Sequence, residues 1–191
     1  MKSSSGGRER RPATPEEAKA LSHPLRMRIL RLCLDEALTN KQLAAGLGRD
    51  PGTVLHHVRT LVRTGFLVPE EVRQGEKGAL EKPYRATGKS WSLSLDVDPA
   101  TEHTASQAML EAFLAELAEA GPDATTGFSR LALTLDKASL QELQGRLQEV
   151  LDEFADRPPD PDGEPYGLFL AMHRRRVTPH VSGRGGVAPR S

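Results

Sequence analysis

Thr53, His56 and Arg59 are spaced three residues apart and carry groups that can donate hydrogen bonds. Residues at this spacing lie on one face of an α-helix, so the hydroxyl, the imidazole and the guanidinium would share one surface. Such donors suit phosphate oxygens and the edges of nucleic-acid bases. The pattern therefore indicates a surface for a polyanion, provided that a helix presents it.

The helix that would present this surface is predicted over residues 51–64. Asp50 can accept hydrogen bonds from the free N–H groups of the first turn, and Pro51 fits that turn because its missing N–H has no helical partner there. Gly65 ends the helix. His57 lies beside the side of the helix that faces the core, so we expect it to be structural and not to read bases. The stripe that faces the core is Val54, Val58 and Leu61, with Val62 beside it.

A shorter helix precedes it. Thr39 and Gln42 form a capping-box pattern, and Gly48 follows where a helix end often needs a left-handed residue. Two helices joined by a tight turn that contains glycine form a helix-turn-helix. Residues 66–68 then read as a strand and residues 83–87 as its return, with Gly75 and Gly78 at the hairpin tip. This order predicts a winged helix-turn-helix, with the wing over residues 66–87.

The first part of the chain should support this unit. Residues 1–13, rich in Ser, Gly and Arg, are expected to be disordered. A capping box at residues 14–17 predicts a short helix that ends before Pro24. Cys33, the only cysteine, is expected to be buried and unreactive, and it excludes an intrachain disulfide. The apolar side of the second helix is predicted to be Leu25, Ile29, Leu32 and Cys33.

The second half is predicted to hold a helix from about Asp98 to Ala120 and a small α/β domain. Residues 131–135 alternate as a half-buried strand does, Asp136 can cap a further helix, and residues 166–172 read as a second strand. The best candidate for a dimerisation face is on the long helix, and packing of that face within its own subunit is the alternative. This face consists of Met109, Leu110, Phe113, Leu114 and Leu117.

The expected fold class is α+β, mainly α. The organisation predicted is a disordered tail at 1–13, a winged helix-turn-helix domain at 14–97, a dimerisation helix and small α/β domain at 98–173, and a disordered basic tail at 174–191. An apolar fraction of 37% and an aromatic fraction of 4% favour two thin layers or a core shared between subunits.

The formal net charge of +0 hides an asymmetry between the two halves. Residues 1–90 hold 17 basic and 10 acidic side chains, a net charge of +7, whereas residues 91–191 hold 9 and 16, a net charge of −7. A basic first half is typical of a protein that binds nucleic acid. No apolar run approaches a membrane span, and the N-terminus lacks the apolar run of a signal peptide, so a cytoplasmic protein without membrane contact is expected.

Together these segments resemble the ArsR-like winged-helix transcriptional regulators. The similarity covers about residues 14–90 and rests on LSHPLRMRILRLC, LTNKQLAAGLG, DPGTVLHHVRTLVRTGFLV and a hairpin that ends in KPYRAT. It implies a homodimeric protein that binds double-stranded DNA, commonly a repressor, at an operator with two-fold symmetry. Leu55 departs from the family's pattern, which more often has a polar residue there, and residues 121–173 resemble an added domain.

The DNA-contacting set follows from the free face of the predicted recognition helix, the start of the supporting helix and the wing. Thr53 and His56 would reach bases or phosphates, Leu55 a thymine methyl, and Arg59 the backbone. The wing would reach the backbone or the adjacent minor groove. The full set is Asn40, Lys41, Gln42, Arg49, Gly52, Thr53, Leu55, His56, Arg59, Arg73, Lys77, Lys82 and Arg85.

Other functions are less well supported by the residues. Many ArsR-like proteins sense metals, but Asp96, Asp98 and His103 lack a second histidine at a matching distance, so no metal and no cofactor are expected. No Gly-rich phosphate loop, nucleophile elbow or His-Glu-x-x-His occurs, so no enzyme is expected. A zinc- or small-molecule-responsive sensor of the same family, with an unknown effector, and a winged-helix adaptor that binds proteins remain alternatives.

Overall fold

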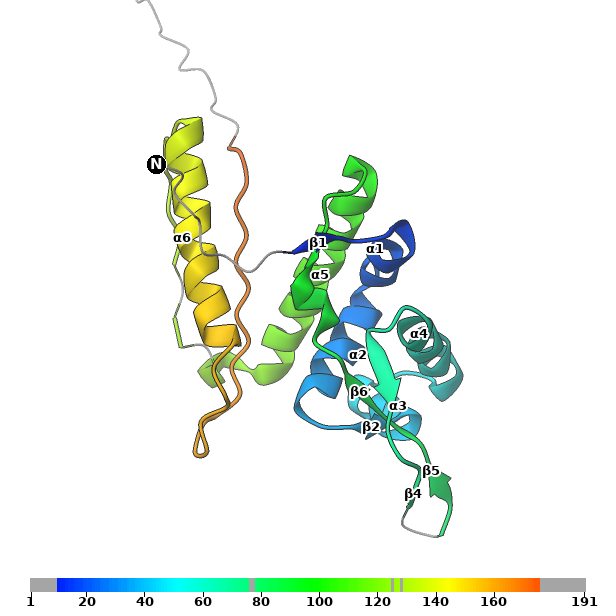
Figure 1. The fold of residues 1–191 in the computed structure, drawn as a ribbon. Helices are drawn as coiled ribbons and strands as arrows, with labels where there is room; N and C mark the ends of the chain where they lie inside the picture. Colours follow the sequence, from blue (N-terminus) through cyan, green and yellow to red (C-terminus); the bar gives the residue numbers. More distant parts are fainter. Residues whose placement is uncertain (1–9, 76–77, 125, 128, 176–191) are drawn as a thin grey trace, which may run out of the picture.

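Five helices and a small sheet enclose one core in the computed structural model, which describes residues 10–75, 78–124, 126–127 and 129–175 (Figure 1). The predicted order of helices and hairpin is confirmed. The helices of this unit are α1 (Pro15–Leu21), α2 (Pro24–Asp35), α3 (Asn40–Leu47), α4 (Pro51–Arg63) and α5 (Pro99–Ala120). Two 3-10 turns, η1 (Lys89–Ser92) and η2 (Pro122–Ala124), follow the wing and α5.

The sheet has the order β2-β6-β3, and both pairings are antiparallel. It consists of β2 (Leu38–Thr39), β3 (Leu67–Pro69) and β6 (Pro83–Ala86). Beyond it the hairpin extends as β4 (Arg73–Gln74) and β5 (Leu80–Glu81), with Gly75 and Gly78 at the tip as predicted. The wing is therefore anchored on the sheet at its base and projects away from the core (Figure 1).

The expectation of disorder is wrong for the end of the N-terminal segment. Arg11–Pro12 forms β1, which pairs in parallel with β7 (Leu93–Ser94), and Ala13 is buried. The reason is an ion-pair cluster: the Arg11 guanidinium donates two hydrogen bonds to the Glu17 carboxylate, at 2.6 and 2.9 Å. Residues 1–9 and 176–191, the other predicted tail positions, lie outside the described residues, whereas residues 174–175 are described and exposed.

The core lies where α2, α3 and α4 meet the sheet. Ile29, Cys33, Leu43 and Phe66 are almost completely buried, and burial raises the pKa of the Cys33 thiol to about 11. The expected inward position of Leu32 is wrong: Leu32 is exposed, and Leu30, next to Ile29, is buried in its place. The apolar side of α2 is therefore rotated slightly from the predicted one.

Helix α5 packs along α2 and α1 and so completes the winged-helix unit. Its contact face is made of small residues, because Ala105, Ala108 and Ala112 are all buried. Asp98 caps the helix: its Oδ1 accepts hydrogen bonds from the N–H groups of Ala100 and Thr101 at 3.1 and 3.0 Å. The predicted start and end of this helix are confirmed.

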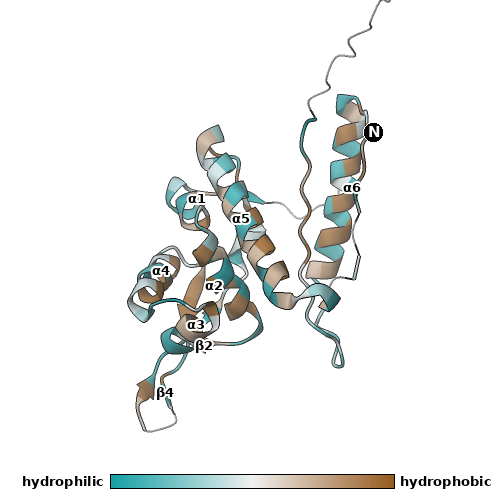
Figure 2. Ribbon diagram, turned by 180° about the vertical axis from the view of Figure 1, so that it is seen from behind, coloured by the Kyte–Doolittle hydropathy of each residue, from teal (hydrophilic) through white to brown (hydrophobic). Residues whose placement is uncertain are grey.

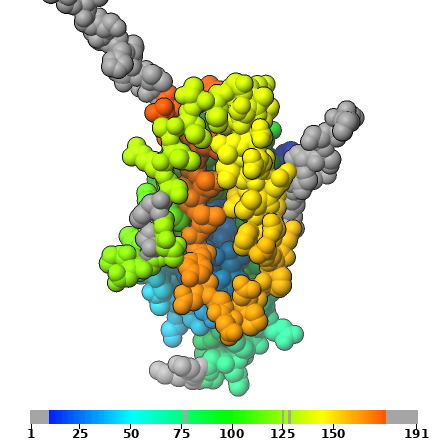
Figure 3. Space-filling view, turned by 90° about the vertical axis from the view of Figure 1, so that its left-hand side faces the viewer, coloured from blue at the N-terminus to red at the C-terminus, as the bar shows by residue number. Residues whose placement is uncertain are grey.

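The C-terminal unit, residues 126–175, holds α6 (Lys137–Ala155), capped by Asp136 as predicted. The two predicted strands are wrong: residues 131–135 and 166–172 have no strand assignment. Both run as extended chain alongside α6 (Figures 1 and 3). Contacts to the winged-helix unit include a stack of Phe113 on Phe169, with ring centroids 5.2 Å apart. Among the described residues, no helix is both long and apolar enough to span a bilayer.

Candidate nucleic-acid interface

Helix α4 separates apolar and polar side chains into two faces (Figure 2). Val54, Val58 and Leu61 are completely buried. The Asp50 Oδ1 accepts a hydrogen bond from the N–H of Thr53 at 3.0 Å, and proline occupies the first turn. The predicted cap and buried stripe are therefore confirmed, and they fix which face of the helix meets solvent.

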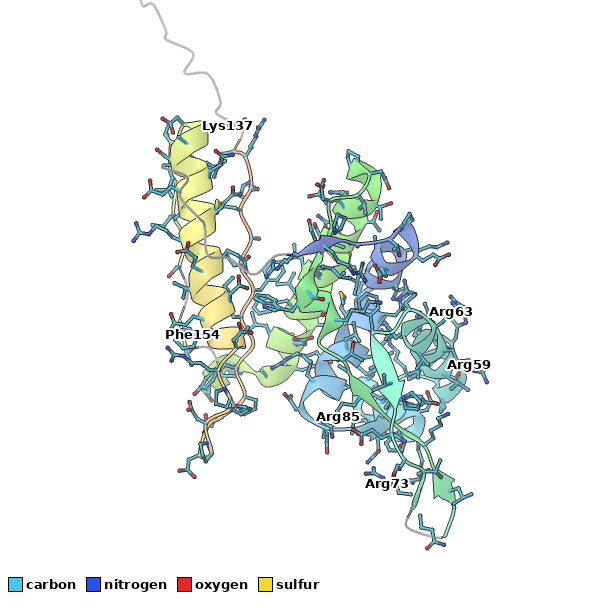
Figure 4. All side chains as sticks on the ribbon, in the orientation of Figure 1. Arg59, Arg63, Arg73, Arg85, Lys137 and Phe154 are labelled. Carbon is cyan, nitrogen blue, oxygen red and sulfur yellow. The ribbon has the colours of Figure 1, made fainter. Side chains whose placement is uncertain are left out.

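The outer face of α4 presents the donors expected from the sequence. Thr53, His56 and Arg59 are exposed, and Leu55 is half-buried at their edge. Arg63, one turn beyond Arg59, is also exposed, and Figure 4 shows both arginines on the outer side of the helix. Arg63 is not among the residues predicted from the sequence, although its spacing of four residues from Arg59 is a signal for the same face. Gly52, at the start of the helix, is exposed as well.

His57 supports α4 from beneath. It is 8% exposed, its ring lies 4.4 Å from that of His23, and its Nδ1 is 3.5 Å from the Arg26 guanidinium. Burial, together with the neighbouring His23 and Arg26, lowers the pKa of His57 to about 4, so the ring is neutral at pH 7. The structure therefore agrees with the expected structural role.

Helix α3 fixes the position of α4 through its first turn. Thr39 and Gln42 exchange capping-box hydrogen bonds of 2.9 and 3.2 Å, and the Asn40 side chain donates to the Pro51 carbonyl at 2.9 Å. Gly48 adopts a left-handed φ of 59°, which turns the chain between the two helices. The side-chain amides of Asn40 and Gln42 are thus used within the protein, whereas Lys41 and, in the turn, Arg49 are exposed.

The wing contributes a smaller free cationic surface than its sequence suggests. The Arg73 guanidinium lies 3.9 Å from the Glu81 carboxylate and donates to the Gln42 side-chain oxygen at 3.4 Å, which joins the wing to α3. Arg85 is paired with Glu70 and lies across the domain from Arg59 (Figure 4). The structure therefore does not bring Arg85 to the α4 surface. Lys82 is exposed, and Lys77 lies outside the described residues.

The C-terminal end of α4 is held by Lys89. Its ammonium donates to the Thr64 carbonyl and forms an ion pair with Glu17, each at 2.6 Å. A cation near the last carbonyls of a helix favours the helix dipole and satisfies a free acceptor. This residue links α4 to α1, and no pattern in the sequence pointed to it.

The residues considered as metal ligands do not converge. Within the described ranges, no group of three or more His, Cys, Asp and Glu side chains is placed to hold a metal ion. Asp98 is used in the cap of α5, and His103 is exposed on the same helix.

Part of this chain matches a known domain family. Residues 21–70 match the helix-turn-helix domain family, which covers α2 to β3. The chain is also similar to the structure of reduced HlyU from Vibrio cholerae, with 18% sequence identity over 47% of this chain and 77% of that chain and a TM-score of 0.29. The search of curated proteins gave no match. Residues 21–70 are therefore a helix-turn-helix domain that presents α4 on a scaffold anchored by the sheet, and this domain supports DNA binding in transcription regulation.

Proposed function

We propose that this protein is a dimeric, ArsR-like repressor that reads a two-fold symmetric operator with α4 in the major groove. The observation that carries the proposal is the division of α4, whose valines are completely buried while Thr53, His56 and Arg59 face solvent. An α-helix fits the major groove, and the residues near its N-terminus usually reach base edges. We propose that the protein acts in the cytoplasm, as the sequence predicts.

The side chains on the outer face of α4 differ in the part of DNA that they would reach. Thr53 and His56, in the first two turns, would contact bases, and the half-buried Leu55 would contact a thymine methyl. Arg59 and Arg63, further along, would contact backbone phosphates. The other proposed contacts, all exposed, are Lys41, Arg49, Gly52 and Lys82.

Three proposed positions have a different role from free DNA contacts. Asn40 joins α3 to α4, Gln42 caps the start of α3, and Arg73 joins the wing to Gln42. We propose that they orient the reading surface, with Arg73 moving to a phosphate when the wing meets DNA. Arg85, which is paired with Glu70, is the weakest candidate, and Lys77 remains a prediction from sequence.

The proposed dimer contact is the face of α5 that carries Met109, Leu110, Phe113, Leu114 and Leu117. Leu114 is 53% exposed, and the others are partly covered. Two-fold pairing would bring two copies of α4 to successive turns of the groove, about 34 Å apart. No observation among the described residues favours a zinc sensor or a protein-binding adaptor over this function.

The double substitution Thr53→Ala with His56→Ala tests base reading. Because both side chains are exposed, the fold should be unaffected, while the affinity for an operator selected from genomic fragments should fall about 10–100-fold. Gel shifts measure the affinity, and circular dichroism checks folding. Unchanged operator affinity in the folded double variant would show that α4 does not read DNA.

Arg59→Ala tests the backbone role. Affinity should fall similarly for operator and unrelated DNA, and the slope of log K against log salt should become shallower by about 1, because one phosphate contact is lost. Arg146→Ala, on the exposed face of α6, is the matched control and should change neither quantity. A loss confined to the operator would argue against a phosphate contact.

A further inference from the structure

Two extended segments of the C-terminal unit expose alternating apolar side chains. Residues 131–135 and 166–172 contain no charged residue and no proline. In natural proteins, charged residues, lysine in particular, and proline normally protect an exposed strand edge. Neither segment has this protection. The exposed side chains are Leu131 (80%), Leu133 (50%), Leu135 (41%), Tyr166 (65%), Leu168 (76%), Leu170 (51%) and Met172 (46%).

The backbone of both segments is also without sheet partners. Among the described residues, no backbone–backbone hydrogen bond joins residues 131–135 or 166–172 to another segment. The Tyr166 carbonyl accepts a hydrogen bond from Arg31, and Phe169 stacks on Phe113, so the second segment is attached to the winged-helix unit at two points. Each segment thus has the composition of a strand without its pairing.

Pairing within one chain would satisfy only part of this backbone. Both segments run toward the N-terminal end of α6, the end that begins at Lys137 (Figure 4), so an internal pair would be parallel. Two strands alone are marginally stable in water, and each would keep one open edge. A sheet with more strands requires a further chain.

The size of the proposed dimer contact points to a second copy as that chain. The α5 face offers five residues, and Phe113 is already covered by Phe169, whereas a standard interface uses about 20–30 residues on each side. The two segments add twelve residues, and Val150 and Phe154 of α6 are 53% and 60% exposed. Because every copy carries the same open segments, the surface is self-complementary.

The position of this surface in the molecule allows a second copy to bind without covering α4. The C-terminal unit and α4 lie on opposite sides of the winged-helix unit (Figure 1). Figure 3 shows residues 166–172, in orange, between α6 and the chain that leads into it, open to solvent on that face. A partner seated there would leave the outer face of α4 uncovered.

We propose that residues 131–135 and 166–172 become strands of a sheet shared with a second copy of this chain. This inference rests on the proposed dimer and extends its contact from α5 to the C-terminal unit. The sheet buries the alternating leucines and pairs the open backbone, and α6 covers one of its faces.

Leu168→Lys in the full-length protein tests the shared sheet. Leu168 is 76% exposed, so the subunit fold should tolerate lysine, while the dimer should dissociate at least about 10-fold more readily because the charge would be buried in it. Leu80→Lys, at 78% exposure in the wing, is the matched control and should leave the dimer unchanged. Light scattering across a concentration series measures both; a dimer unaffected by Leu168→Lys would overturn the proposal.

Hydrogen exchange of the unaltered protein gives a second test. Amides of residues 131–135 and 166–172 should be protected in the dimer and should lose protection on roughly hundredfold dilution, as mass action requires. Protection that persists on dilution would mean pairing within one chain, and absence of protection would mean no pairing; either result overturns the proposal.

DNA binding by the same samples separates this inference from the proposed function. If the protein binds its operator as a dimer and the segments stay unprotected, only the shared sheet is wrong. If the unaltered protein binds no DNA sequence selectively, the proposed function is wrong whatever the C-terminal unit does.

Discussion

At the scale of single residues, two adjacent histidines of α4 have opposite environments. His56 is exposed and available to DNA, whereas His57 lies beneath the helix among His23, Arg26 and the core. The spacing of the residues predicts this difference, because His57 lies beside the buried stripe of Val54, Val58 and Leu61. The sequence contained no signal for the tilted ring contact between His57 and His23, which lies 34 positions earlier in the chain, since that contact depends on how α2 and α4 cross.

The buried histidine makes the stability of the protein depend on pH. The pKa of His57 is about 4 in the folded protein and near 6.5 in the unfolded chain, so the unfolded chain binds the proton more tightly. The stabilisation is complete above pH 6.5 and is lost as the pH falls toward 4, by about 3 kcal/mol in the free energy of unfolding. Urea unfolding at several pH values measures it.

The matched variants are His57→Gln and His56→Gln. Replacing the buried ring should flatten the fall in stability between pH 6.5 and 4, although His23, whose pKa burial also lowers, retains part of it. Replacing the exposed ring should change the fall much less, because His56 is the last of the neighbouring groups that lower the pKa of His57. Equal pH profiles for His57→Gln and the unaltered protein would show that His57 is not the titrating group.

At the scale of elements, Glu17 joins three parts of the fold. Its carboxylate accepts hydrogen bonds from Arg11 of β1, from the Thr14 N–H at the start of α1, and from Lys89, which also holds the end of α4. The Arg11 hydrogen bonds and the Lys89 ammonium hold the pKa of Glu17 well below its usual range. Glu17 is 6% exposed, so its charge is compensated almost entirely by these partners.

Glu17→Gln should therefore lower the free energy of unfolding by about 2–3 kcal/mol, because two cations lose their shared anion in a buried place. The value lies at the low end for buried pairs, since Arg11 is half-exposed and can be rehydrated. Glu16→Gln, exposed on the same turn, should change the free energy by less than about 0.5 kcal/mol. Urea denaturation of both variants at neutral pH compares them, and equal effects would contradict the special role of Glu17.

The same cluster shows why some elements could be predicted from sequence and others could not. The caps at Asp50 and Thr39 depend on atoms three residues apart, so local pattern was sufficient. Strand β1 depends on Glu17 and on β7, about eighty residues away, and its Arg- and Pro-rich sequence resembles a tail. At residues 131–135 the apolar residues alternate as they do in a strand, but a strand also requires a partner, which alternation does not specify.

At the scale of the whole molecule, the basic half of the sequence is also the half that holds the proposed DNA-binding elements. The basic first half of the sequence contains α3, α4 and the wing, and the acidic second half contains α5 and α6. The proposed reading surface therefore lies in the part of the molecule that would attract a polyanion, and the acidic C-terminal unit lies on the other side (Figure 1). This polarity favours approach to DNA with α4 forward.

A dimer with two such reading surfaces makes a prediction about its operator. If two copies of α4 enter successive major grooves on one face of the duplex, the half-sites lie about 10–10.5 base pairs apart. Inserting about 5 base pairs between them rotates one half-site by half a turn, so a rigid dimer can contact only one, and affinity should fall to that of an isolated half-site. Gel shifts with the native, lengthened and single half-site duplexes measure this. If the lengthened operator bound as tightly as the native one, the two reading helices would not be held in a fixed relation, and both the α5 contact and the shared sheet would have to be flexible links.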